Sequence, residues 1–277
     1  MPERKAYLRR ARQWIANRGI RSFLQVAFQR LWYKLLRKPI PGRVRPETGL
    51  HPFDLQHGTD TTGLVFGEKL FDHRDRTEAS EGAHYWVTGY YGVAPSAFRA
   101  ALARLDLPWE RFSFVDIGCG KGRAMLLALG YPFQAVAGVE LAPELAAVAE
   151  RNLNLFRSKQ DSMQTTTHVV AGDATTFDLP SGPLLLFLYH PFAGPVMKRF
   201  LAHVKASVAA EAREVILLYA NPELAPEIQA TEGFELLWRD AFGFSDEDIV
   251  ADRFGSTYEQ FATFRVHPSD PPDLVGA

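Results

Sequence analysis

The sequence has little cysteine and lacks long apolar runs. Among its 277 residues there is one cysteine, Cys119, which excludes an internal disulfide and is typical of a reducing compartment. No stretch approaches the roughly 18 consecutive apolar residues that a membrane-spanning helix needs. The N-terminal region also lacks the unbroken apolar block and small-residue cleavage site of a secretory signal. We therefore expect a cytoplasmic protein.

The motifs of several enzyme classes are also missing. Cys119 has no partner cysteine, and no group of His, Asp and Glu residues has the spacing of metal ligands, so we expect no metal site. There is no Gly-x-Ser-x-Gly nucleophile elbow, and the glycine-rich run at 118–122 lacks the Gly-Lys-Ser/Thr ending of a phosphate-binding loop. The apolar content of 47% and the charged content of 23% are those of an ordinary folded protein. The length suits one large α/β domain with an appended segment.

Charge is divided unevenly along the chain. Residues 1–46 contain thirteen Lys or Arg residues and one acid, Glu3, which gives +12; since the whole chain carries −1, the rest carries −13. Apolar residues from Ile20 to Leu35 recur every three or four positions, which predicts helix with one apolar face. Three prolines between 39 and 46 then predict a linker. We expect 1–46 to form a basic amphipathic helical arm and linker.

Several partners suit this basic arm. Its apolar face can dock on the acidic remainder of the chain, or it can lie in a membrane boundary with its arginines on anionic headgroups. It can also contact the phosphates of a nucleic acid or the ribosome. A targeting peptide is a further option, although the arm contains little serine. All four interpretations stay open, and the second would place the protein at the periphery of a membrane.

Residues 47–111 form a lead-in to the main domain. The segment 47–92 shows little periodicity and several turn-forming residues, so we expect it to be rich in loops. A helix is expected from Pro95 to Leu105, with proline in its first turn. The aromatic pairs Tyr85-Trp86 and Tyr90-Tyr91 precede the first strand of the main domain. We expect this region to act as a lid or to contact substrate, although many such aromatics are plain core residues.

From residue 112 onward, apolar strand-like segments alternate with helical ones. Strands are expected at 113–117, 135–140, 167–171, 183–188 and 214–219, and helices at 122–129, 143–156 and about 194–208. Strands separated by helices pair in parallel through right-handed crossovers, which gives a doubly wound α/β sheet. Two later strands, at 234–238 and 260–266, have only an acidic loop between them and should form an antiparallel pair. We take 112–277 as the ligand-binding domain.

The loop after the first of these strands is a candidate ligand site. In a doubly wound sheet, ligands bind beyond the carboxyl ends of the strands, and Asp116 to Gly122 occupies that place. A dinucleotide-binding loop reads Gly-x-Gly-x-x-Gly, whereas this run has glycine at every second position and Arg123 where that pattern needs glycine. The Asp116 carboxylate would repel a pyrophosphate but can accept hydrogen bonds from a cationic amino group.

The run Asp-x-Gly-x-Gly-x-Gly resembles motif I of the class I S-adenosylmethionine-dependent methyltransferases. That resemblance implies that Glu140, at the end of the second strand, binds the ribose hydroxyls, and that Asp173, after the third strand, binds the adenine amino group. It also implies a seven-stranded Rossmann-like sheet whose seventh strand runs antiparallel between the fifth and the sixth. The implied cofactor-binding residues are Asp116, Gly118, Cys119, Gly120, Gly122, Glu140, Leu141, Asp173 and Ala174. Singly, Asp116 also suits a loop cap and Glu140 a surface acid; their joint spacing favours the cofactor site.

The segment after the fourth strand, Leu188-Tyr189-His190-Pro191-Phe192, is the candidate reaction end. It is similar to an uncharacterised bacterial group of class I methyltransferases, distantly similar to the non-SET histone lysine methyltransferases. That group typically reads Asn-Pro-Phe here and ends its fifth strand with Tyr-x-Asn-Pro, as 219–222 does in this chain. The resemblance covers roughly 50–266 and is firmest over 112–192. It implies transfer of a methyl group to nitrogen, of a protein lysine or a small amine.

His190 is the departure from that pattern, because it replaces the asparagine. We favour a general base near the methyl group, since an amine is mostly protonated at pH 7. The second interpretation is a shape-preserving replacement whose backbone carbonyl does the work. Tyr189, His190 and Phe192 are the candidate catalytic residues. Two other functions stay open: a non-catalytic module that binds the same cofactor, and an NAD-dependent oxidoreductase, which the glycine spacing disfavours.

Overall fold

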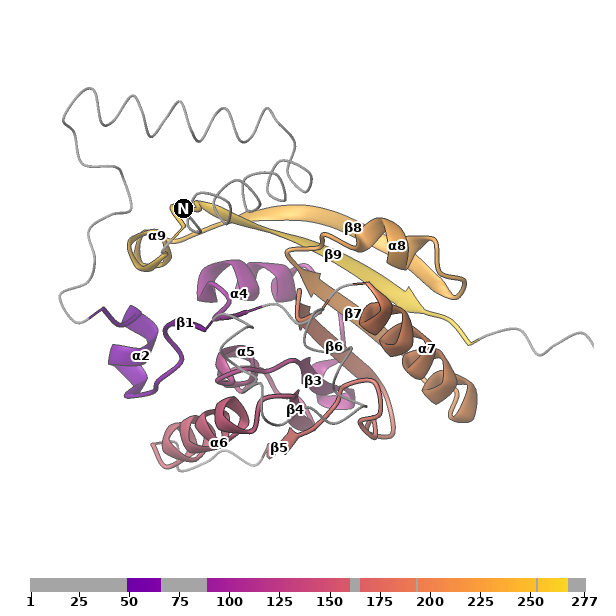
Figure 1. Ribbon diagram of the computed structural model, residues 1–277, viewed down its shortest axis with the longest axis horizontal. Coiled ribbons are helices and arrows are strands. Elements are labelled where there is room, and N and C mark those ends of the chain that lie inside the picture. Colours follow the sequence, from indigo (N-terminus) through magenta and orange to yellow (C-terminus); the bar gives the residue numbers. More distant parts are fainter. Residues whose placement is uncertain (1–48, 66–88, 160–164, 193, 253, 269–277) are drawn as a thin grey trace, which may run out of the picture.

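The computed structural model describes residues 49–65, 89–159, 165–192, 194–252 and 254–268, and its centre is a seven-stranded sheet (Figure 1). The strands are β3 (Ser113–Ile117), β4 (Ala135–Glu140), β5 (Thr166–Ala171), β6 (Leu184–Tyr189), β7 (Val215–Ala220), β8 (Phe234–Gly243) and β9 (Tyr258–Val266). Their order across the sheet is β5-β4-β3-β6-β7-β9-β8. Neighbours from β5 to β7 pair in parallel, and β9 pairs antiparallel with both β7 and β8. The predicted sheet, including the inserted antiparallel last strand, is confirmed.

Helices cover both faces of this sheet and enclose two apolar clusters. The helices around the sheet are α4 (Pro95–Ala103), which belongs to the lead-in, and α5 (Arg123–Ala128), α6 (Pro143–Arg157), α7 (Pro195–Ala210), α8 (Ala225–Gln229) and α9 (Asp246–Ala251). Side chains of β3 alternate between the clusters: Phe114 packs with α4 and α5, whereas Val115 and Ile117 pack with α7. Because every strand in the centre is buried on both faces, the strands read as continuous apolar runs.

The strand order reverses at β3, which has β4 on one side and β6 on the other. Loops leaving neighbouring strands in opposite directions open a crevice at their carboxyl ends. The segments after β3, β4 and β6 therefore meet at one place. These are the segments in which the sequence predicts the cofactor loop, Glu140 and the reaction end.

The lead-in contains more regular structure than we predicted. In the segment expected to be loop, α2 (Pro52–His57) forms a helix that is too short for periodicity to reveal. Its N-terminus is capped by His51 Nδ1, which accepts a hydrogen bond from the Phe53 amide at 3.1 Å, and its C-terminus by Gly58 at φ 71°. Two strands of two residues each, β1 (Leu64–Val65) and β2 (Tyr90–Tyr91), also pair as a short antiparallel ribbon.

The prediction of an acidic loop between the last two strands was also wrong, because this segment contains a helix. It contains α9, whose N-cap Ser245 accepts a hydrogen bond from the Asp248 amide. Three acids in its first turn are favourable at the positive end of a helix dipole, so a run that reads as a solvated loop forms a helix. Asp248 is buried there and contacts His51 at 3.1 Å, which ties α9 to the lead-in.

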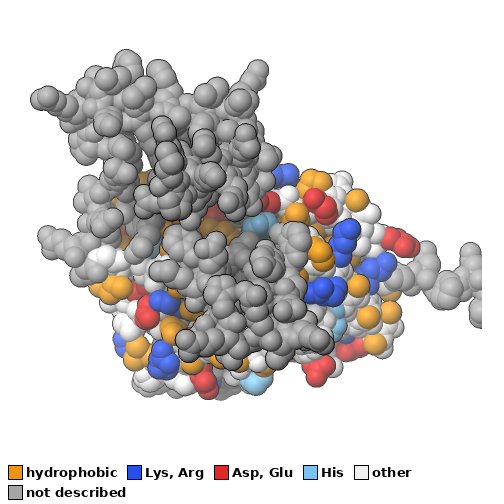
Figure 2. Space-filling view, in the orientation of Figure 1, with side chains coloured by type: hydrophobic (Ala, Val, Ile, Leu, Met, Phe, Trp, Pro, Cys, Tyr) orange, Lys and Arg blue, Asp and Glu red, His pale blue; other side chains and the backbone are white. Residues whose placement is uncertain are grey.

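The basic arm 1–46 and the aromatic pair Tyr85-Trp86 lie outside the described residues. Within the part that the structure describes, no helix has the length and apolar character needed to cross a membrane. On the face shown in Figure 2, the described surface mixes acidic and basic side chains. Because the arm lies outside the described residues, its partners stay predictions.

Candidate functional site

The glycine loop after β3 has a backbone that only glycine adopts easily. Gly118, Gly120 and Gly122 have φ angles of 75°, 54° and 83°. A Cβ on Gly118 would lie 2.6 Å from the Cβ of Pro191, and one on Gly120 would lie 2.1 Å from Cδ2 of Tyr90. The glycines thus let the segment after β6 and the ribbon strand β2 approach the loop closely, and Gly122 packs near helix α6.

Glu140, at the end of β4, holds this loop in place. Its Oε2 accepts a hydrogen bond from the Gly120 amide at 2.8 Å, and its Oε1 accepts one from the Ala142 amide at 2.9 Å. Burial raises the pKa of Glu140, while the backbone hydrogen bonds from Ala142, Gly120 and Leu141 oppose that rise. The side chain also lines the main cavity, so it can both support the loop and meet a ligand.

Asp116, at the end of β3, is in a different situation. The residue is 3% exposed, lines the same cavity, and has no hydrogen-bond donor or cation within reach among the described residues. Burial and the nearby Glu140 raise the pKa of its carboxyl well above the usual value. A buried carboxylate without a partner is costly. A cationic hydrogen-bond donor arriving from the cavity would remove that cost.

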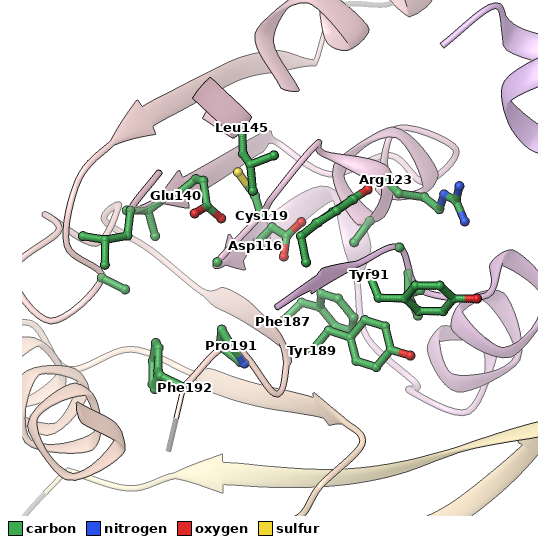
Figure 3. Close-up of a pocket in the computed structure, with 18 of the residues that line it drawn as sticks. Tyr91, Asp116, Cys119, Arg123, Glu140, Leu145, Phe187, Tyr189, Pro191 and Phe192 are labelled. Carbon is green, nitrogen blue, oxygen red and sulfur yellow. The ribbon is translucent and has the colours of Figure 1, made fainter. Parts of the chain in front are cut away.

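The cavity runs from the glycine loop to the segment after β6 (Figure 3). Of the residues predicted for the cofactor and the reaction end, it brings together Asp116, Gly118, Cys119, Glu140, Leu141, Asp173, Ala174, Tyr189 and Phe192. Gly120, Gly122 and His190 do not line it. Burial raises the pKa of the Cys119 thiol well above its usual value, with Asp116 and Glu140 adding to the effect, which disfavours a nucleophilic role.

The part of the cavity near the segment after β6 is aromatic, and two of its tyrosine hydroxyls donate hydrogen bonds to carboxylates. Tyr189 Oη donates to Glu259 Oε2 at 2.5 Å, and Tyr91 Oη donates to Asp252 Oδ1 at 2.9 Å. Phe187 lies beside these rings in Figure 3. Burial raises the pKa of Tyr189 well above its usual value, with Glu259 contributing, so this phenol stays protonated and holds a fixed direction.

His190 has its ring turned toward β7. Its Nδ1 lies 2.5 Å from Tyr219 Oη, and its Nε2 lies 3.6 Å from a carboxylate oxygen of Glu223. Burial lowers the pKa of His190, although Glu223 acts in the opposite direction, so the ring is neutral near pH 7. The residue has φ 43°, a left-handed conformation that asparagine and histidine adopt more readily than most residues.

A buried ionic cluster beside the cavity was not predicted from the sequence. Arg123, at the start of α5, donates from Nε to Thr61 Oγ1 at 2.7 Å, and its Nη2 lies 3.5 Å from Asp54 Oδ2. The side chains of Arg123 and Asp54 are 5% and 0% exposed. The sequence did show an arginine at the start of an otherwise apolar helix, which indicates a buried charge that needs a partner. Its partners could not be predicted, because they lie about sixty residues earlier in the chain.

No protein-family model matches the chain, and no curated protein matches it either. Among solved structures, it is similar to the magnesium protoporphyrin IX methyltransferase of Synechocystis PCC 6803 with bound S-adenosylmethionine, at 14% identity and a TM-score of 0.40 over 62% of this chain and 76% of that one. It is also similar to the ribosomal protein L11 methylase of Lactobacillus delbrueckii subsp. bulgaricus, at 15% identity and a TM-score of 0.41 over 62% and 77%. At such low sequence identities and TM-scores, the similarity carries no argument about function, so the function of this chain has to be argued from its own residues.

Proposed function

We propose that the protein is an S-adenosylmethionine-dependent methyltransferase. The observation that carries this proposal is Asp116, a buried carboxylate without a described partner that borders the cavity. A carboxylate in that state is suited to a ligand that brings a positive charge and N–H donors. The amino group of S-adenosylmethionine offers both, whereas the pyrophosphate of a dinucleotide would add negative charge beside Asp116 and Glu140.

The other lining residues fit the same cofactor. Glu140, at the next strand end, would take the ribose hydroxyls, and Leu141 would pack beside them. Asp173 and Ala174, after β5, would hold the adenine; the Asp173 side chain also accepts a hydrogen bond from the Thr175 amide at 2.8 Å, which fixes its direction. When bound, the cofactor supplies an electrophilic methyl group whose sulfonium leaves as a neutral thioether.

The chain's own contribution would then be mainly positioning, which requires a fixed nucleophile in line with the methyl group. Tyr189 and Phe192 would shape the acceptor pocket, with the Tyr189 ring fixed by its hydrogen bond to Glu259. We propose a nitrogen acceptor, of a protein lysine or a small amine. For His190, the contacts with Tyr219 and Glu223 support the shape-preserving interpretation over the general base.

Thermal unfolding with added ligands tests the cofactor. At about 100 times the dissociation constant, a ligand stabilises by roughly 2.7 kcal/mol, or roughly 5–10 °C in Tm for a chain of this size. We expect such a shift with S-adenosylmethionine and with S-adenosylhomocysteine, and none with NAD. A shift with NAD alone would reverse the assignment.

A second candidate function is a binding module that keeps the cofactor site without turnover. It is favoured by the His190 ring, which faces away from the cavity at the position where asparagine is expected to contact the acceptor. Transfer of a tritiated methyl group to fractionated cell lysate distinguishes the two. Labelled product supports the enzyme, and cofactor binding without any labelled product supports the module.

A further inference from the structure

Exposed apolar side chains gather at the end of α9 and in the turn that follows it. Among the described residues, the large apolar side chains that reach solvent are Leu55, Leu155, Val250, Phe254 and Tyr258. The last three lie close together in the chain, between α9 and the start of β9. With two exposed acids of α9 they form what we call the α9 surface: Asp246, Glu247, Val250, Phe254 and Tyr258. Exposed apolar groups that gather in this way mark a place where something binds.

The helical register brings the acids and the apolar part of this surface together. Asp246 and Val250 are four residues apart on α9, and Glu247 and Val250 are three apart, so these side chains project from one side of the helix. At the end of α9, the buried carboxylate of Asp252 accepts a hydrogen bond from the Phe254 amide at 2.8 Å. That bond holds the turn against the helix and keeps Phe254 beside it.

The described chain begins next to this surface. Its first residue is Gly49, and two residues later His51 contacts Asp248 of α9 at 3.1 Å. Helix α2, which follows, lies against α9 at the same end of the molecule (Figure 1). The segment 36–48, between the helix predicted for the basic arm and this start, reaches about 40 Å when extended. The arm is therefore tethered within reach of the α9 surface, which raises its effective concentration there to about the millimolar range.

Charge favours the α9 surface over the other exposed apolar side chains as the place where the arm binds. The arm carries +12, whereas 246–259 contains five acids and one base, which gives −4. Of the other two, Leu55 lies on α2 and Leu155 on α6. Lys159, just after α6, donates to the carbonyl oxygen of His57 in α2 at 2.7 Å, so a cation lies at the junction of these two helices. A basic helix is attracted to the first place and repelled from the second.

We propose that the basic arm docks on the α9 surface of its own chain. The apolar face of the helix predicted from Ile20 to Leu35 covers the three apolar side chains of this surface, and its cations lie near the two acids. A helix of this length is marginal in water by itself, so its apolar face needs a partner. Docking removes both apolar faces from water. This inference does not depend on the proposed function.

The docked arm would lie close to the main cavity. The ring of Phe254 packs edge-on against the ring of Tyr91, with 5.1 Å between their centroids. Tyr91 lines the cavity, and its hydroxyl donates to Asp252 at the end of α9. An arm that covers Phe254 is therefore separated from the cavity by one aromatic ring.

Hydrogen exchange of the full chain, followed by mass spectrometry, tests the docking. The backbone amides of 20–35 should be protected in the wild type, since the undocked helix is marginal. Val250→Ser combined with Phe254→Ser should lower that protection by about 10-fold or more, because the burial of two apolar side chains is lost. Exchange of the central strands reports whether the variant is folded and should not change.

The matched control is Leu155→Ser combined with Leu55→Ser. These side chains are 39% and 52% exposed, against 38% and 55% for Val250 and Phe254. The control removes a similar amount of exposed apolar surface from another place, so the protection of the arm should stay as in the wild type.

A charge variant measures the electrostatic part. Asp246→Asn combined with Glu247→Gln removes two exposed charges with little change of shape, and should lower the protection of the arm by about 2- to 5-fold. In about 1 M salt, which screens such charges, this variant and the wild type should be equally protected. The charge variant also keeps the test decisive if the serine variant fails to fold.

Several results would overturn the inference. These are no protection of 20–35 in the wild type, protection that survives both variants of the α9 surface, and an equal loss in the Leu55 and Leu155 control. Protection that rises with protein concentration would instead show docking on a second copy. Protection that appears only with vesicles of anionic lipid, or only with RNA, would show an external partner, and either result would also overturn the inference.

Discussion

Two buried carboxylates, Asp54 in the lead-in and Asp116 in the sheet, show how differently the same group is used in two regions. Asp54, in the lead-in, accepts hydrogen bonds from three threonine hydroxyls and one backbone amide and lies beside the arginine. Asp116, in the sheet, accepts none from the described residues. Burial raises the pKa of both, but at Asp54 the hydrogen bonds and Arg123 outweigh it and the pKa is lowered, whereas at Asp116 Glu140 adds to the rise.

We propose that the difference separates a carboxylate that stabilises the fold from one that binds a ligand. A carboxylate surrounded by donors contributes to stability and has no capacity left for a partner. A carboxylate without donors costs stability, and such a cost persists where function needs the group. We therefore read Asp54 as the anchor of the lead-in and Asp116 as the anion of the ligand site.

The largest expected effect is on the lead-in side. Asp54→Ala leaves three threonine hydroxyls and the Arg123 charge without their buried acceptor, and breaking such a pair costs about 3–5 kcal/mol. The free energy of unfolding, from denaturant titration, should fall by that amount. Asp60→Ala is the matched control, because Asp60 pairs with Lys121 while its side chain is 62% exposed, and it should cost less than about 1 kcal/mol. Equal losses of unfolding free energy for Asp54→Ala and Asp60→Ala would contradict the role of Asp54 as the anchor of the lead-in.

The two carboxylates should also differ in which property changes with pH, namely stability for Asp54 and ligand affinity for Asp116. The folded pKa of Asp54 is lowered from 3.8, so its stabilising effect is present above that pH and is lost as pH falls through the folded pKa.

The pKa of Asp116 is raised, so the ammonium group of the ligand should displace a proton from this carboxyl. Ligand affinity should therefore rise with pH through that pKa, until the ligand amine itself loses its proton. Calorimetry in buffers of different ionisation enthalpy detects the released proton. Glu140 and Cys119 also face Asp116, so the assignment requires the release to disappear in Asp116→Asn.

The smallest effect is expected at the reaction end. His190→Asn suits the left-handed backbone at this position and restores the residue of the similar group, so methyl transfer should change by less than about 5-fold. A general base would give about 100-fold loss or more. Initial rates of methyl transfer at saturating cofactor distinguish the shape-preserving role from the general base. A loss of rate of about 100-fold with unchanged cofactor affinity would show that His190 acts as a catalytic residue.

Local patterns predicted the central sheet well, and they indicated two acidic residues, Asp116 and Glu140, that the structure brings to one cavity. The alternation of apolar strands with amphipathic helices depends on neighbours within a few residues, and Asp116 and Glu140 follow from their places at strand ends. The misses share a long-range cause. Helix α9 is tied to His51 from nearly the other end of the described chain, and Arg123 is oriented by threonines about sixty residues earlier.

His190 illustrates the same limit at one residue. Its place after β6 was evident, but its ring direction follows from a positive φ and from Tyr219 on the neighbouring strand. Neither can be read from the residues around it. The sequence therefore indicated that the segment after β6 lies at the cavity, without showing which of its side chains face it.

The most direct test of the central claim is Asp116→Asn, measured by thermal unfolding with and without S-adenosylhomocysteine. The substitution removes a buried carboxyl whose charged form has no described partner, so the ligand-free variant should have an equal or higher Tm than the wild type. The same change should weaken ligand binding by about 10- to 100-fold and remove most of the ligand-induced shift. A variant that loses stability without ligand and binds S-adenosylhomocysteine as tightly as the wild type would contradict the assignment of Asp116 to the ligand site.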